Sequence, residues 1–456
     1  MTLRASPRAH PPKVPKTRHI DFLKGWPNTS LLPLHQLEQA SKRILSDPAN
    51  SDVLFYGPDE GYQPLRGEIA KWLNNFYRPK DIISSERICI SGGASQNLAC
   101  VLQTFTDPVY TRNVWMVAPT YYLACRIFND SGFDNRLKAV PEDAEGIDIE
   151  YLQRAIHESE ARAMAENNSS PRFKSPKPWR KIYKHVIYAV PTFSNPSGRI
   201  MSLERRRALV RLARHYDALI VTDDVYDMLQ WPSDPKAGSH RMDTAVLPRI
   251  VDVDRELDGG VVDEYGHAVS NGSFSKIIGP GCRTGWAEGT PAFVYGLSQT
   301  GSSRSGGAPS HLAASFISQM MSTGVLQNHI LQELQPAYAQ RYHLMMRAVE
   351  QHLLPMGVTV PQADKDVAGG YFIWLTLPAH LDSTLIYKRA LEEANLTVIA
   401  GPMFKVDGDG KIKEARFEQD LRLCYAWEDL DVIEEGIVRL AGVIETELEA
   451  MRSGRG

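Results

Sequence analysis

The sequence predicts an α/β fold in which a mostly parallel, seven-stranded sheet forms a large domain and a smaller α+β domain follows it. Seven short runs rich in β-branched and aromatic residues occur between residues 87 and 288, and amphipathic helical patterns separate several of them. Alternation of strands and helices is typical of parallel sheets whose crossover helices cover both faces. After about residue 311 the pattern changes to long helices followed by isolated strands, which indicates a second domain.

Hydrophobic periodicity places the individual elements. The strands of the sheet are expected at 87–91, 113–118, 136–140, 185–190, 218–222, 268–274 and 285–288. Helices are expected at 34–45, 64–77, 95–105, 149–160, 203–216 and, with breaks, 312–352. Further strands are expected within 369–375 and 421–425. Residues 159–181 and 233–266 are rich in charge, Pro, Ser and Gly, so we expect two surface insertions there.

The expected organisation has four parts. They are a flexible tail (1–20), an N-terminal segment that joins the small domain (21–55), the large domain (56–310) and the small C-terminal domain (311–456). The first 20 residues contain no acidic residue and four prolines, and prolines disfavour the amphipathic helix of a transit peptide. We therefore expect a tail rather than a targeting signal.

Composition excludes several classes of function. The 51 basic and 54 acidic residues give a formal charge of −3, which offers no electrostatic basis for binding nucleic acid or an anionic membrane. No apolar run reaches the about 18 residues that a membrane helix needs. The five cysteines are widely spaced and form no Cys-x-x-Cys pair, so a metal site is not expected, and a reducing compartment, the cytoplasm, fits best.

The stretch from Asn271 to Trp286 carries the most specific chemistry. Ser273 and Ser275 offer hydroxyl donors, and the guanidinium of Arg283 suits a phosphate dianion. Lys276 places a primary amine within this cluster, as expected of a lysine that forms a Schiff base with a phosphorylated aldehyde. The alternative is a solvated lysine on a glycine-rich loop.

Polar residues also follow two of the first predicted strands, where ligands of open α/β sheets gather. After 87–91, Ser95 and Gln96 lie in a small-residue turn that opens a helix, which indicates an anion site or a plain helix cap. After 113–118, Tyr121 could stack on a flat ring or pack in the core.

Three later strands add polar side chains of the same kind. Asn195 precedes a proline and is held extended, so its amide can point into a cleft or form a simple turn. Asp223, with Tyr226 three residues on, follows a buried strand and could pair with a pyridinium nitrogen or cap a helix. Arg422 lies in an otherwise apolar strand and could hold a substrate carboxylate or form a structural ion pair.

In this order the motifs resemble those of fold-type I pyridoxal-phosphate enzymes of the class I/II aminotransferase family. The sequence is most similar to the branch of kynurenine and 2-aminoadipate aminotransferases. The similarity runs from about Gly25 to Tyr425. Its most specific motif is Ser-Phe-Ser-Lys-Ile-Ile-x-x-Gly-x-Arg-x-Gly-Trp, and Asn-Pro-x-Gly and Asp-x-x-Tyr support it.

The resemblance implies a role for each of these residues toward pyridoxal 5′-phosphate (PLP). Lys276 would be the Schiff-base lysine and would move the proton of the substrate α-carbon. The resemblance further assigns Asp223 to the ring nitrogen, Asn195 and Tyr226 to the ring oxygen, Tyr121 to the ring face, and Ser95, Gln96, Ser273, Ser275 and Arg283 to the phosphate. Arg422, the backbone of Gly25, Asn195 and Tyr56 would bind the substrate. Tyr56 would reach the phosphate of a partner subunit, which implies a homodimer with shared active sites.

Three functions remain open from the sequence. The first is an aminotransferase that moves an amino group from an L-amino acid to a 2-oxo acid such as 2-oxoglutarate. An aromatic lining by Trp26, Tyr56, Tyr121 and Phe372 favours aromatic or other long substrates. The second is a lyase or synthase on the same scaffold, acting by β/γ-elimination, replacement or cyclopropane formation.

The third is a cofactor-sensing regulator, which would need a DNA-binding domain ahead of the matched region. Only about 20 residues precede that region, fewer than the about 50 of a small domain. A further hypothesis concerns Arg304 in the Gly- and Ser-rich stretch 300–310. We expect it, or the serines beside it, to cross a dimer interface toward a phosphate.

Overall fold

The computed structural model describes residues 18–453 apart from 176, 238–240, 307–308, 362–365 and 409–415. Most of the expected N-terminal tail therefore lies outside the described residues. A single large sheet organises the rest, with strands in the order β2-β10-β9-β7-β6-β3-β4-β5. The strands are β2 (Ile88–Ser91), β3 (Asn113–Ala118), β4 (Leu137–Asp143), β5 (Gly146–Ile147), β6 (His185–Ala189), β7 (Ala218–Asp223), β9 (Ala268–Ser273) and β10 (Gly285–Glu288).

The centre of the sheet is parallel and buried on both faces. β4, β3, β6, β7 and β9 pair in parallel, and β10 runs antiparallel between β9 and β2. In β3, Val114 and Met116 pack on one face, and Trp115 and Val117 pack on the other. This alternation is the two-residue period of a strand. It explains why the central strands β3, β6 and β7 are mostly apolar.

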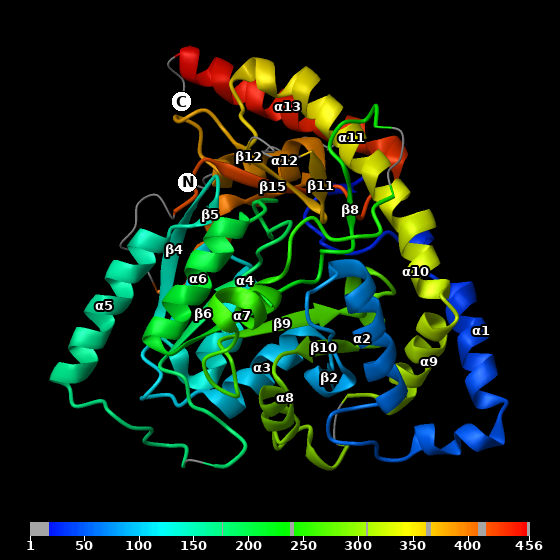
Figure 1. Cartoon of the computed structure of the whole chain (residues 1–456). Coiled ribbons are helices and arrows are strands. Elements are labelled where there is room, and N and C mark those ends of the chain that lie inside the picture. The colour runs from blue at the N-terminus through cyan, green and yellow to red at the C-terminus, as the bar shows by residue number, and fades with distance from the viewer. Residues whose placement is uncertain are drawn as a thin grey trace, which may run out of the picture.

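Helices cover both faces of the sheet (Figure 1). One face packs against α3 (Ala94–Phe105), α4 (Tyr122–Phe128) and α8 (Pro291–Ser298). The other packs against α5 (Ile149–Ala165), α6 (Leu203–Tyr216) and α7 (Ile250–Glu256). The carboxyl ends of the parallel strands therefore meet at one edge, where the chain leaves each strand toward a helix or loop.

The predicted α/β fold is confirmed, with three differences. All seven expected strands are present, and the two-residue strand β5 adds an eighth at the edge of the sheet. The interpretation of 159–181 as an insertion is wrong at its start, because α5 continues to Ala165 and Ser159 is buried against Asn113. The interpretation of 233–266 is wrong for α7, which packs on the sheet.

A smaller part follows the sheet, and most of it lies above the sheet in Figure 1, while its first helix lies beside the sheet. Its helices are α9 (His311–Ser322), α10 (Val325–His329), α11 (Gln335–His352), α12 (Ser383–Ala394) and α13 (Leu430–Arg452). Its strands are β11 (Val367–Gly369), β12 (Phe372–Thr376), β13 (Leu396–Thr397), β14 (Ile399–Ala400) and β15 (Asp420–Cys424), and β11 pairs with β8 (Gln230–Pro232). β12, β15 and β14 form a small antiparallel sheet. The domain boundaries at 55/56 and 310/311 stay a prediction.

The N-terminal segment crosses back onto this smaller part. β1 (Ile20–Asp21) pairs in parallel with β13, and the side chain of Phe22 is fully buried. The segment then passes the edge of the large sheet and continues through α1 (Leu34–Leu45) and α2 (Gln63–Tyr77), which both pack on α9. Residues 22–27 are thereby fixed between the two parts of the molecule.

A pair of glycines in α13 tests how tightly this segment is docked. A Cβ on Gly436 would collide with the Phe22 ring and lie 3.2 Å from Ile20 Cγ2, whereas one on Gly442 would meet no atom within 4 Å. We expect Gly436→Ala to lower the free energy of unfolding by about 2 kcal/mol through overpacking. Gly442→Ala should raise it by about 0.5–1 kcal/mol, because alanine favours the helix. Thermal and urea unfolding of both variants measure the difference, and equal effects would contradict tight docking.

Candidate active site

One cavity of about 370 Å³ opens at the carboxyl edge of the large sheet, between the sheet, the N-terminal segment and β12–β15. This volume is typical of pockets for small-molecule ligands. Most of the residues predicted from the sequence line it, namely Gly25, Ser95, Tyr121, Asn195, Asp223, Tyr226, Ser273, Ser275, Lys276, Arg283 and Arg422. They come from positions between 25 and 422, so the fold brings them together.

One end of the cavity is built to receive an anion. Ser273 donates from Oγ to Ser275 Oγ at 2.9 Å, and Ser95 lies in the first turn of α3. Arg283 donates from Nη2 to the Gly92 carbonyl at 2.9 Å, across the turn that opens α3. A Cβ on Gly93 (φ +99°) would come within 2.6 Å of that Nη2, so glycine keeps this end open. Hydroxyls, a guanidinium and a helix N-terminus together favour a phosphate.

A carboxylate, Asp223, lies at the end of β7 in the same cavity. Tyr188 donates its hydroxyl to Asp223 Oδ2 at 2.8 Å, and Asn271 donates from Nδ2 to Oδ1 at 2.9 Å. Burial raises the pKa of Asp223 to about 6, while the hydrogen bond from Tyr188 lowers it. No lysine or arginine forms an ion pair with it in the described part of the chain. A carboxylate held this way can pair with a cationic ring nitrogen.

The amine of Lys276 faces the same space. Its Nζ donates to the Gly25 carbonyl at 2.8 Å and lies 5.8 Å from the centroid of the Tyr226 ring. Burial, together with the nearby charge of Arg422, lowers the pKa of the amine to about 8. A lysine with a lowered pKa is neutral part of the time near neutral pH, so it can act as a nucleophile or a base.

Arg422 is a buried cation that also lines the cavity. It donates from Nη1 to Asn195 Oδ1 at 3.0 Å and from Nη2 to the Leu23 carbonyl at 2.5 Å. Its Nε has no hydrogen-bond partner, and its guanidinium lies 4.1 Å from the centroid of the Phe372 ring. No described carboxylate pairs with it, although buried charges are normally paired. A carboxylate ligand would supply the missing charge.

Three predicted residues lie outside the lining of this cavity. The side chain of Gln96 accepts from the Gly92 amide at 2.9 Å and donates to Cys100 Sγ at 2.9 Å. Tyr56 is 84% exposed on the surface. Arg304 binds Gln299 and lies 3.8 Å from Asp59.

The sequence did not identify the residues that bind Lys276 and Asp223 from outside the cavity. Tyr371 donates its hydroxyl to the Lys276 carbonyl at 3.0 Å, and Tyr338 contacts that hydroxyl at 3.1 Å. Tyr188 and Asn271 hold Asp223 in the same way. A buried tyrosine needs a partner for its hydroxyl, but the sequence does not indicate which group that partner is.

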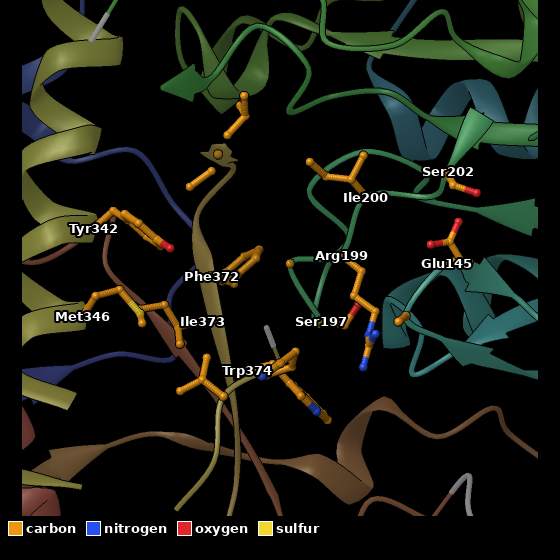
Figure 2. Close-up of a pocket in the computed structure, with 17 residues that line it drawn as sticks. Glu145, Ser197, Arg199, Ile200, Ser202, Tyr342, Met346, Phe372, Ile373 and Trp374 are labelled. Carbon is orange, nitrogen blue, oxygen red and sulfur yellow. The ribbon is translucent and has the colours of Figure 1, made fainter. Parts of the chain in front are cut away.

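A second cavity, of about 110 Å³, is lined by Phe372 and lies between the loop at 197–202 and the smaller part (Figure 2). Its labelled lining includes Glu145, Ser197, Arg199, Ile200, Ser202, Tyr342, Met346, Ile373 and Trp374. Arg199 forms an ion pair with Glu142, at 3.4 Å, and donates a hydrogen bond to the Asp143 carbonyl, at 3.0 Å. The described lining offers no amine and no unpaired cation, so the reactive groups lie in the larger cavity.

Comparisons with known proteins point to one family. The family model "Aminotransferase class I and II" matches residues 28–440. An uncharacterized protein of Saccharomyces cerevisiae is 34% identical over 449 residues, covering 94% of this chain and 98% of that protein. The aromatic-amino-acid aminotransferase 1 of Thermococcus litoralis is 28% identical over 436 residues, covering 94% and 89% of the two chains. The 2-aminoadipate transaminase of Thermus thermophilus is 28% identical, covering 93% and 90%.

Solved structures give the same result. The kynurenine aminotransferase of Pyrococcus horikoshii, solved with pyridoxamine phosphate (PMP), superposes with a TM-score of 0.74 at 28% identity, covering 95% of this chain and 92% of that one. The α-aminoadipate aminotransferase LysN of Thermus thermophilus, in complex with a phosphopyridoxyl-leucine, gives 0.69 at 26% identity, covering 94% and 93%.

Proposed function

We propose a reaction for this chain from the premise that it belongs to the class I and II aminotransferase family and is a PLP-dependent enzyme that transfers amino groups. The donor is an L-amino acid with an aromatic, aminoadipate-like or other long side chain, and the acceptor is a 2-oxo acid such as 2-oxoglutarate. The observation that carries the proposal is the meeting of Lys276, Asp223 and the unpaired Arg422 in one cavity.

The residues of the cavity fit PLP at both of its ends. The phosphate would be held by Ser95, Ser273, Ser275 and Arg283, where glycine at 93 leaves room beside the guanidinium. When bound, PLP supplies an aldehyde that forms an imine with an amine, and a protonated ring that withdraws electrons from the substrate. Asp223 would hold the proton at the ring nitrogen, and its two neutral donors keep it ionised for that purpose.

The remaining residues orient the substrate and move one proton. Arg422 binds the α-carboxylate of the amino acid through its guanidinium fork, beside Asn195 and the backbone of Leu23. That contact fixes the α-carbon with respect to Lys276, whose amine would take the proton from the α-carbon and deliver it to the carbon that carries the aldehyde in free PLP. Asn195 and Tyr226 would contact the ring oxygen, and Tyr121 the ring face.

The lining supports the substrate class. Trp26, Tyr121 and Phe372 present aromatic surface to the cavity, and Leu23, Tyr122 and Leu123 extend it. Such a surface favours large, flat or aliphatic side chains. The named relatives, which include enzymes for aromatic amino acids, 2-aminoadipate and kynurenine, point the same way.

We also propose a homodimer in which Tyr56 completes the site of the partner. Tyr56 is 84% exposed, and Leu54 and Phe55 beside it are 68% and 70% exposed, as expected of a surface that a second copy covers. Asp59 accepts from the Ser305 amide at 2.7 Å, so the Arg304 loop is fixed beside Tyr56 and could reach the same phosphate. Unchanged cofactor affinity and dimerisation in Arg304→Ala would contradict that role.

The cytoplasm is the proposed location, supported by the five free cysteines. None of the helices that the structure describes has the length and apolar composition to cross a membrane.

A single half-reaction tests the function. The PLP-loaded protein is mixed with one L-amino acid and no oxo acid, and the absorbance of the cofactor is followed. We expect one equivalent of 2-oxo acid per subunit and full conversion of the cofactor to its amine form, with phenylalanine, kynurenine or 2-aminoadipate. D-Phenylalanine is the control. Continued product formation without an acceptor would instead indicate the lyase or synthase alternative, and no conversion with any amino acid would contradict amino transfer.

A further inference from the structure

The Asp223 carboxylate is held from both neighbouring strands. β7 lies between β6 and β9, and each neighbour supplies one donor. The Tyr188 hydroxyl of β6 binds Oδ2 at 2.8 Å, and the Asn271 amide of β9 binds Oδ1 at 2.9 Å. Asn271 is the register partner of Asp223 in the parallel ladder, so the backbone itself brings the two side chains together. One donor for each oxygen fixes the plane of the carboxylate.

The amide of Asn271 makes two further hydrogen bonds. Its Nδ2 also donates to the Ala94 carbonyl at 3.0 Å, and its Oδ1 accepts from Asn97 Nδ2 at 2.9 Å. A flipped amide would set its oxygen against two acceptors, so only this orientation satisfies the group. Asn97 and Asn271 are 2% and 1% exposed. Buried amides are costly unless fully bonded, so this arrangement is well defined.

These contacts join the two ends of the cavity. Ala94 and Asn97 belong to the first turn of α3, and Ser95 in that turn lines the anion-binding end. Asn271 therefore connects the turn that would hold the phosphate to the carboxylate that would hold the ring nitrogen. The distance between these two points has to match the length of one rigid ligand.

We infer that Tyr188 and Asn271 are positioning residues of the PLP site: both orient Asp223, and Asn271 also sets its spacing from the N-terminus of α3. The inference rests on the proposed role of Asp223. Neither side chain lines the cavity, so both act through the carboxylate and the helix rather than by touching the substrate.

The groups around Asp223 determine whether the loss of a donor raises or lowers its pKa. Burial raises its pKa, Asp224 beside it in the chain raises it further, and Lys276 across the cavity lowers it, as do the bonds from Tyr188 and Asn271. The phenols of Tyr121 and Tyr226 also lie within electrostatic reach. Removing a donor therefore moves the pKa of Asp223 upward. The carboxylate is then protonated at higher pH, and the acidic limit of PLP binding moves to higher pH with it.

The test measures the PLP dissociation constant by equilibrium dialysis from pH 5 to 9, with Tyr188→Phe and Asn271→Leu. We expect each variant to bind PLP about tenfold more weakly at pH 7.5, because a hydrogen bond to a charged group is lost. The acidic limit should also rise in both. Tyr183→Phe is the matched control, since this fully buried tyrosine donates to the Gly266 carbonyl at 2.6 Å, away from the cavity. It should leave PLP binding within about twofold of the parent protein.

Two further variants separate the possible failures. Asn271→Asp keeps an acceptor for Asn97 but sets a second anion against Asp223, so it should weaken PLP binding more than Asn271→Leu does. Asp223→Asn is the reference for the proposed function. Suppose that Asp223→Asn weakens PLP binding while Tyr188→Phe and Asn271→Leu match Tyr183→Phe in affinity and pH dependence. The positioning roles are then overturned, and the role of Asp223 stands. If Asp223→Asn binds PLP like the parent protein, the role of Asp223 and this inference both fall.

Discussion

Replacing Lys276 with alanine is expected to lower the rate of amino transfer by about 10⁴-fold, the largest loss of any single substitution in this chain. The amine is the one primary amine positioned beside both Asp223 and Arg422 in the described cavity, and its lowered pKa of about 8 suits proton transfer near neutral pH. The half-reaction, followed by the absorbance of the cofactor, measures the rate. Borohydride should no longer fix PLP to the variant.

Lys24→Ala is the control for covalent fixation. Lys24 also borders the cavity, but its Nζ lies 3.4 Å from Asp21 and 4.8 Å from the centroid of the Trp427 ring. Borohydride should still fix PLP to this variant. Fixation that persists in Lys276→Ala and disappears in Lys24→Ala would reassign the reactive amine.

Lys276→Ala also tests whether two subunits share each active site. In a mixed dimer of Lys276→Ala and Tyr56→Ala subunits, one site has its own Lys276 and the partner's Tyr56, and the other site lacks both. Mixing the two weakened proteins should therefore restore activity, up to about a quarter of the parent value at random reassociation. Mixing without recovery would contradict a contribution of Tyr56 to the partner's site.

Arg422→Met is expected to give the second-largest effect, a loss of about 10²- to 10³-fold in kcat/KM for the amino acid. Two charge-assisted hydrogen bonds to a carboxylate contribute about 3–4 kcal/mol. The free protein should lose little stability, because the two hydrogen bonds given up to Asn195 and the Leu23 carbonyl are offset by the removal of a buried cation that no described carboxylate pairs with. Steady-state kinetics and thermal unfolding without substrate measure the two effects.

Arg206 provides the contrast to Arg422. It is also fully buried, but it donates to the carbonyls of Met201, Pro248 and Pro191 within the large domain. Arg206→Met leaves these three carbonyls unpaired, more acceptors than the two that Arg422 binds, and should lower the melting temperature more than Arg422→Met does. Arg422→Lys keeps the positive charge but loses the two parallel donors of the guanidinium. Its affinity for the substrate should therefore lie between those of the parent protein and of Arg422→Met. A strong loss of stability in Arg422→Met would indicate a structural role instead.

The sequence predicts the sheet well because its signal is local. The central strands β3, β6 and β7 are buried on both faces and appear as mostly apolar runs, whereas β5 has only two residues and gives no pattern. α7 was missed because Asp252 and Asp254 make it look polar. In the fold these carboxylates are buried against Arg249 and Arg214. Such pairing depends on residues that periodicity does not connect.

The candidate site likewise contains some residues that the sequence predicts and others that it does not. Residues at strand ends, such as Asp223 and Asn195, are predictable because the carboxyl ends of parallel strands meet at one edge. Tyr188 and Asn271 depend on the register between strands, which the sequence does not specify by itself. The turning of the Gln96 side chain toward Cys100 likewise depends on local geometry within α3.

The docking of the N-terminal segment bears on how the protein is made. Ile20 and Leu23 leave the ribosome long before residues 396–422, yet β1 pairs with Leu396–Thr397 and the Leu23 carbonyl binds Arg422. The strands up to Glu288 can assemble during synthesis, whereas these contacts form only after residues 396–422 have emerged. The part of the candidate site proposed to bind the substrate carboxylate is therefore completed late, and a nascent chain interrupted before β15 would hold a folded sheet without Arg422.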